Sequence, residues 1–184
     1  MKALVVYESM FGNTALVARA IGAGLGADSV VKVACAPAFV PDDVDLLVVG
    51  APTHAHGLSR PATRSQAADR GAMDGATADG VREWLGQLGV PRAILGAAFD
   101  TRRSGPTLLT GSAASGVHKL LASAGVRVIG TRSFVLADGE ETGAGAMSED
   151  ELERARWFGS ELRTTSRALE RHDSGHTRRE AAGG

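Results

Sequence analysis

The sequence predicts an α/β fold in which parallel strands form one sheet covered by helices on both faces. Two observations support this prediction. Short apolar runs alternate along the chain with segments whose apolar residues recur at helical spacing. The 184 residues are 43% hydrophobic and 22% charged, which is the composition of a globular domain long enough to bury a substantial core.

Five apolar runs are predicted as strands, at residues 3–7, 29–33, 45–50, 92–99 and 126–136, the last interrupted near Gly130. Helices are predicted at 15–25, 77–88 and 113–124, and from a capping-box match at Ser148 and Glu151 to about Leu169. Residues 53–74 show no clear periodicity and are expected to form a long loop. We expect one domain over residues 1–170 and a disordered polar tail over 171–184.

The charge and the cysteine count restrict the cellular setting. A formal net charge of -1 argues against binding to nucleic acid or acidic membranes through bulk electrostatics. Cys35 is the only cysteine, so no internal disulfide can form, and we expect it to be a small buried residue in a reducing compartment. The sequence shows no targeting signal and no apolar run near the roughly 18 residues of a membrane span, so a cytoplasmic protein is expected.

The first candidate binding segment comes directly after the first predicted strand and opens a helix. It consists of Ser9, Met10, Phe11, Gly12, Asn13 and Thr14. Backbone N–H groups and the helix dipole favour a phosphate at such a position, and Gly12 allows a close approach of the backbone. The G-x-G-x-x-G and P-loop patterns are both absent. The residue types alone leave a plain helix cap and a phosphate site equally open.

The string Ser9-Met10-Phe11-Gly12-Asn13-Thr14 closely resembles the phosphate loop of flavodoxins. Its setting, with Tyr7-Glu8 before it and Ala15 after it, is similar as well, and a looser resemblance extends over roughly residues 2 to 165. The resemblance implies a flavodoxin-like three-layer sandwich with strand order 2-1-3-4-5. It also implies FMN as the cofactor, with its phosphate in this loop.

The second segment follows the third predicted strand and contains Pro52, Thr53, His54, Ala55, His56 and Gly57. The resemblance implies that this loop covers one face of the flavin ring, with Gly57 near the flavin N5. His54 stands where flavodoxins usually carry Trp or Tyr, and we expect protonation of His54 or His56 to stabilise the anionic reduced flavin. A metal site, which Asp69 and Asp74 would have to complete, and a solvated loop without function remain alternatives.

The third segment leaves the fourth predicted strand and contains Phe99, Asp100, Thr101 and Arg102. Asp100 matches an aspartate of the flavodoxin pattern, but Phe99 replaces a glycine and no stacking tyrosine follows. This departure resembles a divergent, single-domain bacterial branch of the family. We expect the backbone of residues 99–101 to meet the pyrimidine edge of the ring. Arg102 and Arg103 would face the ring carbonyl or a partner's phosphate, or remain solvated.

The resemblance implies electron transfer through FMN between a reductase and an acceptor protein, with no separate catalytic residue and no metal. The nearly neutral chain, with Arg60, Arg64 and Arg70 in its long loop, argues against strong electrostatic steering of partners. One alternative is an FMN-dependent reductase or oxidase that binds a quinone or porphyrin-like substrate with residues 54–74. A non-redox binding module with a degraded flavin site is the second alternative.

Overall fold

A five-stranded parallel sheet forms the centre of the protein. The computed structural model describes residues 1–54, 56–69, 72, 79–105, 111–137 and 146–181, with side chains described up to residue 172. The strands are β1 (Ala3–Tyr7), β2 (Ser29–Lys32), β3 (Leu46–Pro52), β4 (Leu95–Arg103) and β5 (Arg127–Leu136). Their order in the sheet is β2-β1-β3-β4-β5, and every neighbouring pair is parallel. The predicted fold class and strand order are thereby confirmed.

The register of the central strands brings two of the candidate segments to one edge of the sheet. Tyr7 at the end of β1 pairs with Gly50 of β3, and Gly50 pairs in turn with Phe99 of β4. Residues that follow these positions therefore lie at the carboxyl edge, where ligands of open α/β sheets bind. The segments that begin at Ser9 and Thr53 lie there together.

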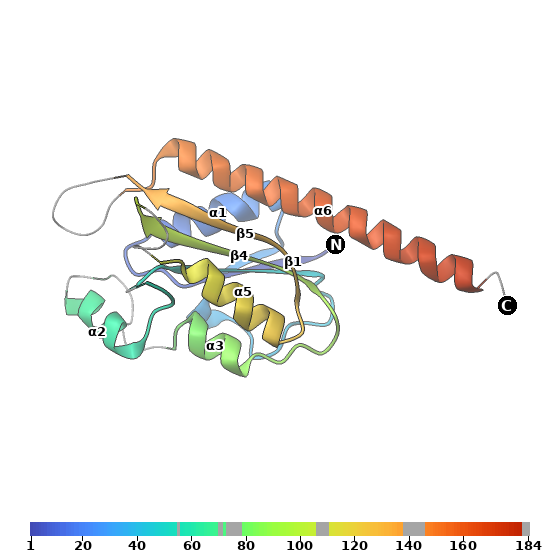
Figure 1. The fold of residues 1–184 in the computed structure, drawn as a ribbon, viewed down its shortest axis with the longest axis horizontal. Coiled ribbons are helices and arrows are strands. Elements are labelled where there is room, and N and C mark those ends of the chain that lie inside the picture. Colours follow the sequence, from blue (N-terminus) through green and yellow to red (C-terminus); the bar gives the residue numbers. More distant parts are fainter. Residues whose placement is uncertain (55, 70–71, 73–78, 106–110, 138–145, 182–184) are drawn as a thin grey trace.

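One face of the sheet is covered by α1 (Asn13–Leu25) and α6 (Glu149–Ala181), which pack side by side (Figure 1). Glycines let the two backbones touch. A Cβ on Gly24 would lie 1.9 Å from the carbonyl oxygen of Arg156, and a Cβ on Gly159 would lie 2.1 Å from that of Ile21. No side chain fits at either position without separating the helices.

The other face is covered by α3 (Val81–Gln87) and α5 (Ala113–Ser123), with α2 (Pro61–Asp69) next to them at the carboxyl edge (Figure 1). The connection from β2 to β3 contains only one short 3₁₀ helix, η1 (Val33–Cys35). The three layers of the predicted sandwich are thus present.

Several boundaries differ from those predicted. β4 continues past Phe99 to Arg103, and α2 forms within the segment expected to be a loop. α6 continues past Leu169 to Ala181, because residues 170–181 contain no proline and many helix-favouring residues. The irregularity expected near Gly130 is present as a β-bulge, although β5 is continuous. Gly96 of β4 pairs with Val128 of β5, but the next residue of β4, Ala97, pairs with Gly130, so β5 has one extra residue there.

One single residue also departs from expectation. Cys35 is exposed on η1, so its prediction as a small buried residue is wrong. Trp157 on α6 is 66% exposed. Within the described part of the chain, no helix has the length and apolar character needed to cross a bilayer.

Candidate functional site

The loop between β1 and α1 gathers backbone N–H groups around one oxygen atom. The hydroxyl oxygen of Ser9 accepts hydrogen bonds from the backbone N–H of Gly12, at 3.2 Å, and of Ala15, at 3.3 Å. Gly12 has φ 92° and ψ -25°, a left-handed conformation that side chains other than hydrogen strongly disfavour. The loop is thus shaped to direct N–H donors toward an oxygen at the start of a helix.

Other side chains of this loop hold it in place. The hydroxyl of Thr14 is buried and lies 2.7 Å from that of Thr101 on β4. The Asn13 side-chain oxygen accepts from the backbone N–H of Met147, at 3.2 Å, which ties the loop to the start of α6. Met10 is buried, while Phe11 is only partly buried. Among these residues, Thr14 and Asn13 thus have anchoring contacts inside the protein.

The segment after β3 makes a tight turn. His54 N–H donates to the Gly57 carbonyl, at 2.8 Å, and Gly57 N–H donates to the His54 carbonyl, at 2.9 Å. His56 adopts φ 73° inside this turn and forms a β-bridge with Gly111. The contact needs a glycine at position 111, because a Cβ there would lie 2.2 Å from the His56 Cα. Ala55 lies outside the described residues. The turn is therefore fixed at its base, where it joins β3.

Asp100 connects that turn to the start of α5. Its side chain is 0% exposed, and its Oδ2 accepts from the Thr53 hydroxyl at 3.1 Å, the Ser112 hydroxyl at 2.7 Å and the Ala114 N–H at 2.9 Å. The Thr53 hydroxyl oxygen in turn accepts from the Ala113 N–H, at 3.0 Å. Asp100 is therefore built into the joint between β3, β4 and α5.

The other members of the third segment are placed differently from expectation. Residues 99–101 lie inside β4 and pair with β3 on one side and β5 on the other, so their backbone is engaged in the sheet. Phe99 is fully buried and packs edge-on against Phe134, with ring centroids 6.3 Å apart. Arg102 donates to the Gly105 carbonyl, at 2.8 Å. The fourth strand is thus longer than predicted, and the contact of residues 99–101 with a flavin ring stays a prediction.

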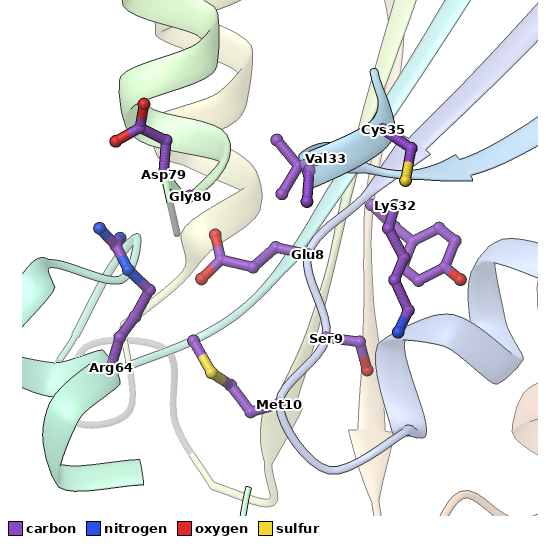
Figure 2. Close-up of a pocket in the computed structure, with 11 residues that line it drawn as sticks. Glu8, Ser9, Met10, Lys32, Val33, Cys35, Arg64, Asp79 and Gly80 are labelled. Atoms are coloured by element: carbon purple, nitrogen blue, oxygen red, sulfur yellow. The ribbon is translucent and has the colours of Figure 1, made fainter. Parts of the chain in front are cut away.

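A buried polar cluster that the sequence did not reveal lies beside the turn, and Figure 2 shows two of its members, Glu8 and Arg64. Ser59 donates to Glu8 at 2.5 Å and accepts from Arg64 at 3.0 Å, and Arg64 pairs with Glu83 at 3.1 Å. The second Glu8 oxygen accepts from the Val81 N–H, at 2.9 Å. Arg64, expected in the long loop, lies on α2 instead and is buried, with its side chain turned inward toward Glu8 and Glu83.

The cluster sets the electrostatic surroundings of His54. Burial lowers the pKa of this imidazole below its usual 6.5; the Glu8 carboxylate opposes that shift and the Arg64 guanidinium adds to it. His54 is therefore neutral at pH 7. A protonated His54 is therefore not expected near neutral pH, and the expected stabilisation of a reduced flavin by His54 would require a lower pH.

Within the described part of the chain, the two histidines of the turn have no metal-ligand set around them. Among the described residues, no group of three or more His, Cys, Asp and Glu side chains is close enough to hold an ion, and Asp74 lies outside those residues.

Comparison with solved structures establishes the fold. A flavodoxin from the domain Archaea matches with a TM-score of 0.58 and 19% identity, over 91% of this chain and 99% of that one. The flavodoxin of Streptococcus pneumoniae TIGR4 matches with a TM-score of 0.56 and 18% identity, over 90% of this chain and 99% of that one. Flavodoxin 1 from Bacillus cereus matches with a TM-score of 0.56 and 17% identity, over 88% of this chain and 96% of that one. The chain is a flavodoxin-like protein by fold.

A flavone reductase also matches, with a TM-score of 0.56 and 16% identity, over 92% of this chain and 64% of that one. Neither the family models nor the curated protein sequences give a match to this chain. Because every identity is below 20%, the fold is shared while the chemistry has to be argued from the residues.

Proposed function

We propose that this protein binds FMN and transfers electrons between partner proteins. The observation that carries the proposal is the convergence of the Gly12 and Ala15 N–H groups on the Ser9 oxygen at the entrance of α1. An oxygen already held there by two N–H donors, next to a helix N-terminus, marks a position that suits a phosphate. The fold of solved flavodoxins supports the same proposal.

In this proposal the loop of residues 9–14 holds the FMN phosphate, and the turn of residues 52–57 lies against the ring. FMN supplies the redox chemistry when bound, while the protein supplies position and electrostatics. The Asp100 joint holds the turn next to α5, and neutral His54 offers an uncharged, partly buried surface. These residues set the orientation of the ring and exclude water from one side of it.

The visible absorption spectrum of the purified protein tests this proposal. We expect bands near roughly 375 and 450 nm, values that belong to any oxidised flavin, and release of FMN on denaturation. A colourless protein whose spectrum does not change on addition of FMN would contradict the proposal and favour a non-redox binding module.

A second candidate function is an FMN-dependent reductase with its own small substrate, such as a quinone. Two observations favour it. The formal charge of -1 gives little long-range steering of protein partners, and a cavity lies beside the cluster next to His54. Steady oxidation of NADH or NADPH by the isolated protein in the presence of a quinone would distinguish this enzyme from an electron carrier.

A further inference from the structure

Glu8 is a buried carboxylate at the junction of the two segments that the proposed function assigns to FMN. It comes directly before Ser9, which opens the loop of residues 9–14. Its Oε1 accepts from the hydroxyl of Ser59, at 2.5 Å, and Ser59 comes two residues after Gly57, where the turn of residues 52–57 ends. Only 6% of Glu8 is exposed. Its negative charge is therefore shielded from water between the loop and the turn.

The hydrogen bonds of Glu8 are those of an ionised carboxylate. Its second oxygen, Oε2, accepts from the backbone N–H of Val81, at 2.9 Å, so that each oxygen accepts and neither donates. Gly80 allows this close packing, since a Cβ there would lie 2.7 Å from Glu8 Oε2. The charge is thus held at one place by donors from two separate parts of the chain.

Arg64 brings a positive charge to the same region. It is 4% exposed, and Figure 2 shows its side chain reaching from α2 toward the Glu8 carboxylate. Its Nη1 donates to Ser59 at 3.0 Å and forms an ion pair with Glu83 at 3.1 Å. Within the described part of the chain, the ion pair of Arg64 is with Glu83 rather than with Glu8. Glu8 and Arg64 are therefore two buried charges of opposite sign at different positions beside the turn.

His54 shows that both charges act on the turn. Burial has the largest influence on the pKa of this imidazole and lowers it, while the Glu8 carboxylate raises the pKa and the Arg64 guanidinium lowers it. Charges act more strongly through a buried site than through water. A charge that forms beside the turn is therefore opposed by one of these residues and favoured by the other.

Reduction of a flavin changes the charge of its ring. Two electrons and one proton convert the neutral oxidised ring into an anion, and in the proposed function a reductase supplies the electrons and an acceptor protein removes them. Charged groups near a flavin tune this equilibrium. A carboxylate disfavours the anion, and a guanidinium favours it.

We propose, on the basis of the function proposed above, that Glu8 and Arg64 set how tightly the site holds reduced FMN relative to oxidised FMN. Glu8 lowers this affinity ratio and Arg64 raises it. Neither residue is assigned a contact with the ring, and both act through the field that they produce at the turn. The ratio determines the midpoint potential of the bound flavin, and a tenfold change corresponds to about 30 mV for a two-electron couple.

Two variants that each remove one charge test the proposal. Glu8→Gln keeps the size of the side chain and an acceptor for the Val81 N–H, and we expect it to raise the affinity ratio about tenfold. Arg64→Gln should lower the ratio. Equilibration of the FMN-loaded protein with a reference dye of known potential measures both changes. Damage to the structure would not produce shifts of opposite sign, because it weakens the binding of both redox states.

Two further variants are the matched controls. Arg64→Lys keeps the positive charge and should leave the ratio within about twofold of wild type. Asp45 pairs with Arg92 directly before β3, at the opposite edge of the sheet, so Asp45→Asn removes a carboxylate far from the turn. This variant should leave the ratio unchanged as well.

Titration of His54 in the flavin-free protein provides a readout that needs no cofactor. Followed by NMR, its midpoint should move to lower pH in Glu8→Gln and to higher pH in Arg64→Gln. If wild type binds FMN but the charge-removing variants keep its affinity ratio, or shift it in the same direction, the role of the two charges is refuted while the proposed function stands. If Glu8→Gln does not fold, equal ratios for Arg64→Gln and Arg64→Lys refute that role. A wild type that takes up no FMN refutes both.

Discussion

Two opposite charges, those of Glu8 and Arg64, act on His54, whose turn is only partly open to solvent. Burial lowers the pKa of its imidazole in the folded protein, and Glu8 on one side only partly offsets this. In the unfolded chain the imidazole regains its usual pKa of about 6.5 and takes up a proton first. The folded state therefore loses stability as the pH falls below 6.5, toward the lower pKa of the folded protein.

Replacing His54 tests this dependence. We expect His54→Asn to flatten the decline in the free energy of unfolding as the pH falls below 6.5, because Asn does not titrate. Urea unfolding at several pH values measures it. If wild type and variant decline in parallel over that range, His54 is not the group responsible.

Gly12 has the left-handed backbone that lets the loop of residues 9–14 turn into α1. An L-residue in that region costs about 1–2 kcal/mol, so Gly12→Ala should lower the free energy of unfolding by that amount and weaken FMN binding as well. Gly86→Ala is the matched control. Gly86 lies inside α3 with open space where its Cβ would be, and this change should stabilise by about 0.5–1 kcal/mol. Equal effects of the two substitutions on stability would contradict the role given to Gly12.

At the scale of elements, Asp100 joins β3, β4 and α5 through donors from Thr53, Ser112 and Ala114. Removing the carboxylate leaves these donors unpaired in a buried place. Asp100→Ala should therefore cost about 1–3 kcal/mol, whereas Asp100→Asn keeps an acceptor oxygen and should cost less. Thermal unfolding of the two variants provides the comparison, and indistinguishable midpoints would show that the hydrogen bonds at this joint contribute little.

The elements also show what the sequence could predict. β1 and β3 are fully buried apolar runs, and their placement needs no knowledge of the rest of the chain. α2 was missed because its sequence, PATRSQAAD, has no apolar stripe; only Arg64 and Ala67 are buried in it. β4 was predicted too short because its last residues are polar and charged, and they extend the strand only by pairing with β3 and β5.

At the scale of the whole molecule, the fold and the strand-to-helix loop of residues 9–14 were predictable, whereas the cluster beside them was not. The loop is one contiguous string at a strand-to-helix junction. The cluster joins Glu8 to Ser59 and Val81, residues 51 and 73 positions away, and no local pattern signals such contacts. The surroundings of residues 99–101 depend on long-range packing of this kind, because their strand pairs with both β3 and β5.

The central claim is that the loop of residues 9–14 binds the phosphate of FMN. Riboflavin has the same ring and ribityl chain but lacks the phosphate, so it isolates the contribution of this loop. Several charge-assisted N–H contacts contribute about 1.5–3 kcal/mol each, which predicts that the apoprotein binds FMN at least 100-fold more tightly than riboflavin in a fluorescence titration. Equal affinities for the two flavins, or no binding of either, would contradict the claim.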